Sequence, residues 1–341
     1  MNLREGLGFK YLLPQEQQAY RVMLEAFSSM ASSVDCSQIN RSVDLMKVMQ
    51  TVLGDNPSIV YFDKTQIQTE ASIFGKRVIL TGVQPKPQAE KMNIAIKAIT
   101  GQIISFVRAS SNDEYSLLVN IYNFLQENAR YDENEFKAIL SGTSNSVVSH
   151  NAYGALINRV AVCDGFSSAF ALLAQKLGFE CMLVTGHSAY SSGLFSDHAW
   201  NIVKVQDRFY HLDVTWDARK YDEFGEYSYD YFTLKDEEIS NDHNWDKKSV
   251  PVCSYNNFSY YVRNGLYVDN SEKLNQVIKA YANKQTNVFR MKLSRNISLP
   301  SNAGEYLAQR VINEGTKFTG RIKFSYGWNE NTRCFFAKIV N

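Results

Sequence analysis

The chain has 341 residues, of which 45% are hydrophobic and 21% are charged, as in ordinary globular proteins that bury several cores. Its 36 basic and 35 acidic side chains leave a formal net charge of +1, which removes the electrostatic case for binding nucleic acid or an anionic membrane surface. No stretch approaches the ~20 apolar residues of a membrane span. The five cysteines are odd in number and form no CxxC pair, so neither a disulfide framework nor a finger-type zinc site is expected.

The N-terminal segment lacks the apolar core of a signal peptide. We therefore expect a cytoplasmic protein. A chain that had lost its leader would have the same sequence, so a secreted or surface location is the alternative.

The first 110 residues predict an N-terminal domain of helix–sheet–helix type. Pro14 occupies a favoured first helical position, and apolar residues at helical spacing follow it. We expect a second helix over 39–53, short strands over 58–62 and 65–81, and a long helix over 92–106.

A second domain is expected over 111–250. Ser111 and Glu114 have the spacing of a capping box, in which a hydroxyl and a carboxylate satisfy the first backbone N–H groups of a helix. Apolar residues at helical spacing over 117–125 extend that helix, and the segment 141–150 has the composition of a loop.

Cys163 lies at the start of an amphipathic helix predicted over 166–177, which Gly178 ends. A thiol in this position faces unpaired backbone N–H groups and the positive end of the helix dipole, and both favour the thiolate. The same N–H groups can hold a tetrahedral oxyanion. The alternative is that Cys163 is a small buried hydrophobic residue, as free cysteines often are.

Three strand-like segments follow this helix, with a Ser- and Gly-rich loop over 186–197 that we expect to be mobile and to border the active-site cleft. The last two segments predict a hairpin. If Gln206 and Asp207 are its two turn residues, Val205 faces Arg208. Asp213 then becomes the diagonal neighbour of His198 on the same face of the sheet.

A thiol at a helix start, a histidine on a strand and a carboxylate on the next strand form a nucleophile–base–orienter set. His198 would take the proton of Cys163 and later return it to a leaving amine. Asp213 would fix the tautomer of the imidazole and stabilise the imidazolium.

Three sequence motifs resemble those of the transglutaminase-like superfamily, namely AVCDGFSSAF, DHAWNIVKV and YHLDVTWD. The resemblance extends over about 115–246 and includes segments similar to bacterial members. It implies an α+β fold related to that of papain-like cysteine proteases, in which a helix bearing the cysteine packs on an antiparallel sheet. It also implies catalytic roles for Cys163, His198 and Asp213. Tyr153 could donate to an oxyanion and Trp200 could wall the cleft; a place in the core is the alternative for both.

The last segment, 251–341, predicts a small C-terminal α+β domain that serves in packing or substrate recognition. We expect a hairpin over 258–268, helices near 274–281 and 306–312, a strand over 288–293, and a closing hairpin of 321–326 with 334–340.

The sequence favours a cysteine enzyme that attacks a peptide or glutamine-type amide and forms a thioester, with a peptide or protein as substrate and no cofactor. Hydrolysis is expected, because water is always present; amine-acceptor cross-linking is the alternative. A second alternative is an inactive binding or scaffold protein on the same fold. A metal hydrolase that uses His187, His198 and His211 lacks a ligand frame such as HExxH.

Overall fold

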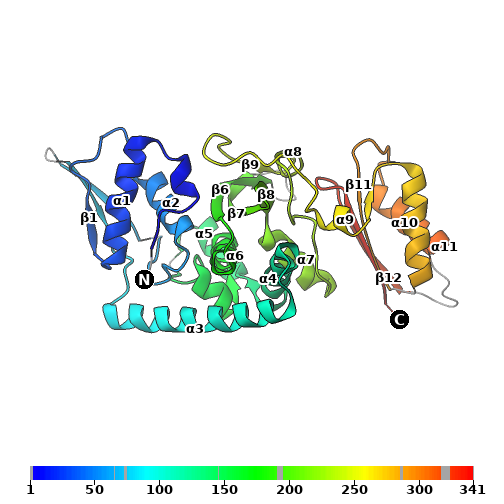
Figure 1. The fold of residues 1–341 in the computed structure, drawn as a ribbon, viewed down its shortest axis with the longest axis horizontal. Coiled ribbons are helices and arrows are strands. Elements are labelled where there is room, and N and C mark those ends of the chain that lie inside the picture. Colours follow the sequence, from blue (N-terminus) through cyan, green and yellow to red (C-terminus); the bar gives the residue numbers. More distant parts are fainter. Residues whose placement is uncertain are drawn as a thin grey trace. The chain divides into compact units, whose positions relative to one another are not determined.

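The computed structural model describes residues 3–64, 66–72, 75–144, 146–189, 195–284, 287–315 and 323–340. The chain divides into two compact units (Figure 1). One comprises Met1–Ser228 with His243–Ser254, and the other Tyr229–Asp242 with Tyr255–Asn341. Each unit contains helices and a mainly antiparallel sheet, which confirms the predicted α+β class. The three-domain division at 110 and 250 stays a prediction.

The first unit holds the predicted site residues. Its helices are η1 (Gly8–Tyr11), α1 (Pro14–Ser28), α2 (Leu45–Asp55), α3 (Lys86–Ser110), α4 (Glu114–Asn128), α5 (Glu133–Leu140), η2 (Gly154–Asn158), α6 (Cys163–Leu177) and α7 (Val214–Phe224). Its strands are β1 (Ser33–Asp35), β2 (Gln68–Ser72), β3 (Gly75–Ile79), β4 (Arg130–Tyr131), β5 (Val160–Ala161), β6 (Cys181–Ala189), β7 (Phe195–Val205), β8 (Arg208–Leu212) and β9 (His243–Asn244).

Two helices begin later than the sequence predicts, because an aspartate caps each of them. Asp44 accepts hydrogen bonds from the backbone N–H groups of Met46 and Lys47, so α2 begins at Leu45 and not near residue 39. Asp113 accepts from the N–H of Ser116 and is the N-cap of α4. The capping box predicted from Ser111 is therefore wrong by two residues.

The sheet of order β8-β7-β6-β9 is antiparallel throughout, and α6 packs on β6 and β7. Two polar side chains lock α6 to β7. The hydroxyl of Ser167 donates to the carbonyls of Cys163 and Ala199, at 2.8 and 2.9 Å, and the amide of Asn201 donates to the carbonyl of Ser167 at 3.0 Å. These bonds tie the first turn of the cysteine-bearing helix to the residue that follows His198.

The predicted hairpin register is confirmed, because Val205 pairs with Arg208 across Gln206 and Asp207. Both turn residues have a positive φ, 47° and 61°, as a two-residue turn of type I′ requires. The predicted strand is too long at its far end. It stops at Leu212, and the next residue, Asp213, caps α7 instead of continuing the strand.

The segment 186–197 was expected to be a loop, but its described part is strand. β6 continues to Ala189, β7 begins at Phe195, and the pairing runs as far as these two residues. Residues 190–194 lie outside the described residues, and the expected mobility stays a prediction. His198 therefore sits well inside a long hairpin.

The second unit is built around one four-stranded sheet of order β10-β11-β13-β12. Its elements are α8 (Asp236–Ile239), α9 (Tyr260–Arg263), β10 (Tyr267–Val268), α10 (Ser271–Lys284), β11 (Val288–Leu293), α11 (Ala303–Gly315), β12 (Lys323–Asn329) and β13 (Cys334–Val340). The predicted closing hairpin is confirmed by the antiparallel pairing of β12 with β13. The hairpin predicted over 258–268 is wrong: α9 occupies its first half, and β10 pairs in parallel with β11.

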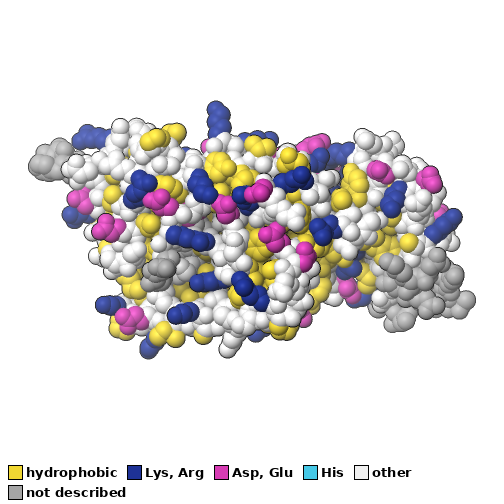
Figure 2. All heavy atoms as spheres, viewed as in Figure 1, with side chains coloured by type: hydrophobic (Ala, Val, Ile, Leu, Met, Phe, Trp, Pro, Cys, Tyr) yellow, Lys and Arg dark blue, Asp and Glu magenta, His cyan; other side chains and the backbone are white. Residues whose placement is uncertain are grey.

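The surface fits the balanced charge of the sequence. On the face drawn in Figure 2, basic and acidic side chains are interspersed over the described residues. Among those residues, no helix is long and apolar enough to cross a membrane.

Candidate active site

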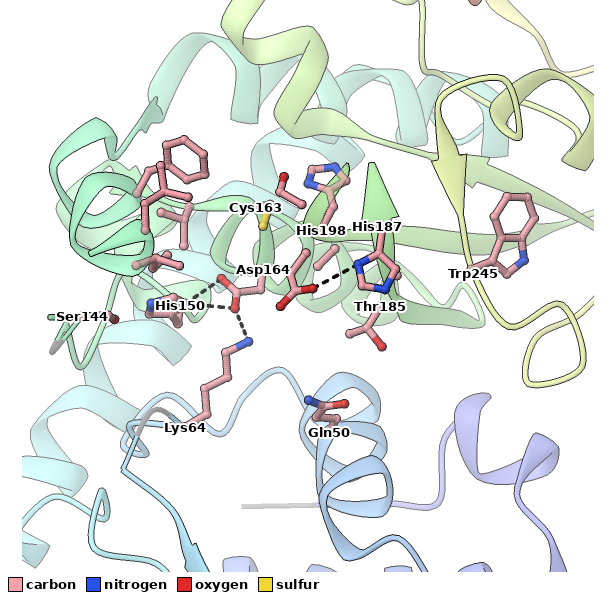
Figure 3. Close-up of a pocket in the computed structure, with 18 of the residues that line it drawn as sticks. Gln50, Lys64, Ser144, His150, Cys163, Asp164, Thr185, His187, His198 and Trp245 are labelled. Atoms are coloured by element: carbon pink, nitrogen blue, oxygen red, sulfur yellow. Dashed lines mark hydrogen bonds and ion pairs between the residues drawn. The ribbon is translucent and has the colours of Figure 1, made fainter. Parts of the chain in front are cut away.

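Cys163 is the first residue of α6 and lies in a cleft of about 920 Å³ (Figure 3). Val162, which precedes the helix, gives it no side-chain cap, so the N-terminal turn faces the cleft uncapped. Cys163 is half-buried, whereas Cys36, Cys181, Cys253 and Cys334 are buried. Of the five thiols, Cys163 is therefore the one that a substrate in the cleft can reach.

His198 and Asp213 are brought together as the hairpin register predicts. The Nε2 atom of His198 lies 2.7 Å from the Oδ2 atom of Asp213, and both side chains are buried. Cys163 lines the same cleft as His198, and its side chain contributes to the raised pKa of that imidazole. Because Nε2 is directed at Asp213, Nδ1 is left to face the thiol. The imidazole thus stands between sulfur and carboxylate.

Asp213 has a partner for each of its oxygens. Its Oδ1 accepts from the backbone N–H groups of Thr215 and Trp216, at 2.9 and 3.3 Å, as the N-cap of α7. Its backbone carbonyl accepts from the Tyr122 hydroxyl at 2.9 Å. The start of α7 therefore fixes the carboxylate, and Oδ2 remains directed at His198.

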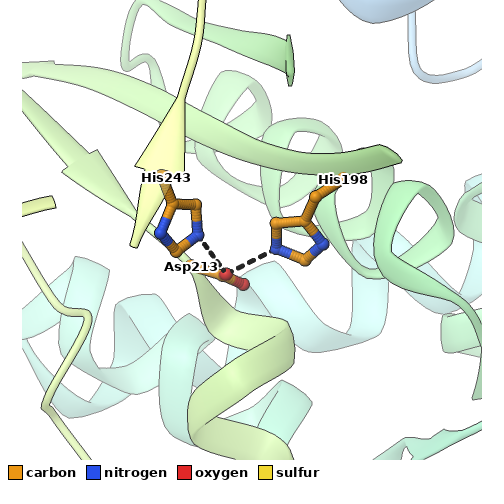
Figure 4. Close-up of side chains that lie close together, drawn as sticks. All are labelled: His198, Asp213 and His243. Carbon is orange, nitrogen blue, oxygen red and sulfur yellow. Dashed lines mark hydrogen bonds and ion pairs between the residues drawn. The ribbon is translucent and has the colours of Figure 1, made fainter. Parts of the chain in front are cut away.

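A second histidine, His243, shares that Oδ2 atom, which the sequence analysis missed. Its Nε2 lies 3.1 Å from Oδ2, on the other side of the carboxylate from His198 (Figure 4). His243 is buried on β9, which pairs with β6 at the edge of the sheet. The signal available in the sequence was a lone histidine in the segment DHNW, thirty positions beyond Asp213.

Gly186 allows β9 to lie close to β6. A Cβ atom at this position would lie 2.3 Å from the carbonyl oxygen of Asn244 and 2.9 Å from the ring of Trp200. Since backbone cannot yield as a flexible side chain does, the strand that carries His243 depends on a glycine here.

We expect Gly186→Ala to destabilise the protein by about 1–3 kcal/mol, because the new methyl group pushes against backbone and a packed ring. Gly101→Ala is the matched control: it lies inside α3, and its Cβ would meet nothing within 4 Å. We expect this control to stabilise the protein by up to ~1 kcal/mol. Thermal unfolding of both variants measures the difference, and equal midpoints would contradict this account of β9.

The surroundings of the buried His198 and Asp213 favour the charged form of each side chain, an imidazolium and a carboxylate. Burial alone would lower the pKa of His198, but the charge and hydrogen bond of Asp213, together with the contact with Cys163, outweigh it and raise the pKa to about 9. Burial opposes ionisation of Asp213, yet His198 and the hydrogen bond from His243 hold the pKa of its carboxyl well below the usual range. At neutral pH the site therefore favours a charged His198.

A second ionic network lies beside the thiol. Asp164, directly after Cys163, contacts His150 at 3.0 Å and forms an ion pair with Lys64. The other ring nitrogen of His150 lies 3.1 Å from a carboxylate oxygen of Glu135 on α5. Burial opposes ionisation of Asp164, but Lys64 and His150 hold its pKa well below the usual range. Lys64 comes from the first hundred residues, in which the sequence analysis predicts no site residue.

Of the other residues singled out from the sequence, Tyr153 and Trp200 are not among those that line the cleft, whereas His187 is. Tyr153 is half-buried just before η2, and its side chain is not among those that line the cleft. Trp200 is buried, stacks on His198 with ring centroids 6.0 Å apart, and donates from Nε1 to His211 at 3.0 Å. His187 lines the cleft and pairs with Asp197 at 3.1 Å. The oxyanion role of Tyr153 and the cleft role of Trp200 stay predictions.

One group of residues in the site has the chemistry of a metal site. His198, Asp213 and His243 place ligand atoms within 4.8 Å of one another. Both imidazole Nε2 atoms are already directed at the same carboxylate oxygen, and all three side chains are buried. A bound ion would have to displace both hydrogen bonds, so the existing bonds account for this arrangement.

Comparison with known proteins concerns the segment that carries Cys163, His198 and Asp213. The sequence model of the transglutaminase-like superfamily matches residues 102–214, which include Cys163, His198 and Asp213. This segment is a member of the transglutaminase-like superfamily. The kyphoscoliosis peptidases of Homo sapiens and Mus musculus are 39% and 38% identical to this chain over 61 residues, in a match that covers 16% of this chain. The chain spans only 9% of the length of these curated relatives.

Two solved structures show a weaker likeness to this chain. One is a transglutaminase, with a TM-score of 0.32 and 15% identity, for which the match covers 44% of this chain and 43% of that one. The other is a proposed cysteine protease from Cytophaga hutchinsonii, with a TM-score of 0.27 and 14% identity, covering 44% and 61% of the two chains.

Proposed function

We propose that the protein is a thiol-dependent acyl transferase that attacks a peptide or glutamine-type amide with Cys163. Hydrolysis is the favoured outcome. The observation that carries the proposal is the arrangement of His198, which lines the same cleft as Cys163 and has Nε2 at 2.7 Å from Oδ2 of Asp213. A thiol, a base and an orienting carboxylate in this order form an activated nucleophile.

In the first half of the reaction, the proton of the Cys163 thiol passes to Nδ1 of His198, which gives the charged imidazolium that the site favours. The sulfur then forms a bond to the amide carbon, and the carbonyl π electrons move to the oxygen. The carbon–nitrogen bond breaks as His198 returns the proton to the leaving nitrogen, which leaves as an amine. A thioester on Cys163 remains.

In the second half, water attacks the thioester and gives its proton to His198. The carbon–sulfur bond breaks, a carboxylic acid leaves, and the thiol is restored. The N–H groups in the first turn of α6 would hold the oxyanion in both halves, since the helix starts uncapped at Cys163. Asp213, held by α7 and by His243, would keep the proton on Nε2 of His198 and so leave Nδ1 able to accept one.

Amine-acceptor transfer is the second candidate, because it differs only in the attacking molecule. Asp197 and Asp246 are among the residues that line the cleft, and their carboxylates would attract a cationic amine. The scaffold alternative would need no ordered base beside the thiol. The hydrogen-bonded His198 and Asp213 favour an enzyme over it.

The two acyl acceptors can be separated by mass. Peptide pools that contain glutamine would be incubated with the protein in H₂¹⁸O, with and without an added primary amine. Hydrolysis places one ¹⁸O atom in a product carboxylate, whereas transfer joins the added amine to the acyl group as the original amine or ammonia leaves. We expect ¹⁸O in the product even when amine is present; neither product, with Cys163 intact, would contradict the proposed function.

The pH profile should report His198. The leaving nitrogen needs the proton of His198, so we expect kcat/KM to fall as the pH rises through about 9, the raised pKa of this group. The free energy of unfolding should depend on pH in the same direction. Protonated His198 stabilises the fold fully below the pKa of free histidine, ~6.5, and this contribution is lost as the pH rises through about 9. A descending limb near pH 6 would contradict the assignment.

A further inference from the structure

An apolar wall forms part of the cleft that holds Cys163. Tyr131, Phe136, Ile139 and Leu140 line it, and three of the four belong to α5. Ile139 is 40% exposed and Leu140 is 68% exposed, so both present uncovered apolar surface. Tyr131 and Phe136 meet edge to face, with ring centroids 5.9 Å apart. Exposed apolar side chains beside a reactive group indicate a binding surface.

This wall is held at a fixed place relative to the thiol. β4 pairs in parallel with β5, which sets Tyr131 beside Ala161, two positions before Cys163. Asp132 caps α5 and also accepts from the hydroxyl of Ser149 at 2.8 Å. Glu135 on α5 is joined through His150 to Asp164, the neighbour of Cys163. Such support fits a rigid subsite better than a mobile flap.

The position of His198 indicates which side of the cleft receives the leaving group. The leaving nitrogen must lie within reach of His198, because this imidazole returns the proton. In Figure 3, Ser144 and His150 lie on one side of Cys163, and Thr185, His187 and Trp245 lie on the other, beyond His198. Glu135 ties α5 to His150, so the apolar wall lies on the side away from the leaving group.

We propose that Tyr131, Phe136, Ile139 and Leu140 form a subsite for an apolar side chain on the acyl side of the amide that Cys163 attacks. This assignment rests on the proposed acyl transfer and adds a substrate class to it. The preferred substrate is a peptide segment that carries a leucine-like or phenylalanine-like residue before the attacked carbonyl. Leu140 can bury a further apolar side chain at little cost, because it is already exposed to water.

The test compares two blocked dipeptide amides of aminomethylcoumarin, which fix the acyl side. One has leucine and the other aspartate before the attacked carbonyl. Wild-type protein should favour the leucine amide. Leu140→Asp should lower kcat/KM for it by about 10- to 100-fold, the range expected for lost burial of one side chain. Ile94→Asp is the matched control, since Ile94 is 70% exposed on α3 and is not among the residues that line the cleft.

A binding measurement keeps the subsite and the chemistry apart. Fluorescent peptides that contain leucine or aspartate would be titrated into the Cys163→Ala variant, with and without Leu140→Asp. Weaker binding of the leucine peptide in the double variant alone supports the subsite even if neither amide is cleaved. Turnover without preference, preference for an apolar residue on the leaving side, or equal binding to both variants would overturn it and leave the proposed function standing.

Discussion

Cys163→Ala is expected to abolish turnover, with a loss of more than about a thousandfold, because no other group in the cleft can form the thioester. Cys163 is half-buried at a helix start, and replacing its thiol group with a hydrogen atom removes little packing. The fold should therefore survive. Release of product from a peptide pool measures activity, and circular dichroism with thermal unfolding measures folding.

The matched control for this variant is Cys36→Ala, which removes a buried thiol elsewhere in the same unit. Cys36→Ala should be compared with Cys163→Ala by activity and not by stability alone, because the lost sulfur atom leaves a small cavity in the core. Its activity per folded molecule should equal that of the wild type. Activity retained by folded Cys163→Ala protein would rule out the proposed nucleophile.

Asp213→Asn is expected to lower kcat by about 10²- to 10⁴-fold, as the loss of the orienting carboxylate does in related triads. Asparagine caps a helix as well as aspartate, so its Oδ1 can keep the bonds to the N–H groups of Thr215 and Trp216. Its amide nitrogen would replace Oδ2 and present a donor to His198. The imidazole must then carry its proton on Nδ1, facing the thiol, where it cannot accept one.

Comparison with Asp213→Ala separates the two roles of this residue. The alanine variant loses the orienting group and the cap of α7, which costs a further ~1 kcal/mol of stability. Both variants should have low activity, and the alanine variant should unfold at the lower temperature. An asparagine variant that retains more than a tenth of the wild-type kcat would contradict the role of Asp213.

The local part of the site could be predicted because short-range geometry determines it. A two-residue turn at Gln206 and Asp207 sets the register of the hairpin, and the register brings Asp213 to His198. The cysteine-bearing helix follows from its apolar spacing and from Gly178, which has φ of 103° at its end. Each of these features depends on residues close together in the chain.

The rest depends on contacts between distant segments. His243 reaches Asp213 because β9 joins the edge of the sheet, and Lys64 reaches Asp164 from the N-terminal hundred residues. No periodicity encodes such pairings. The strand predicted through Asp213 failed for a different reason, namely that the Asp213 side chain caps α7 and so ends the strand at Leu212.

The rate of alkylation of each cysteine by iodoacetamide at pH ~6.5, measured by peptide mass spectrometry, tests the central claim most directly. An ordinary thiol has a pKa of ~8.5 and is about one-hundredth thiolate at this pH. Since Cys163 begins α6, is the half-buried thiol of the cleft and shares that cleft with the base His198, it should react far faster than an ordinary thiol, and His198→Ala should slow it. Cys163 alkylation no faster than that of an ordinary thiol, and unchanged in His198→Ala, would contradict the account.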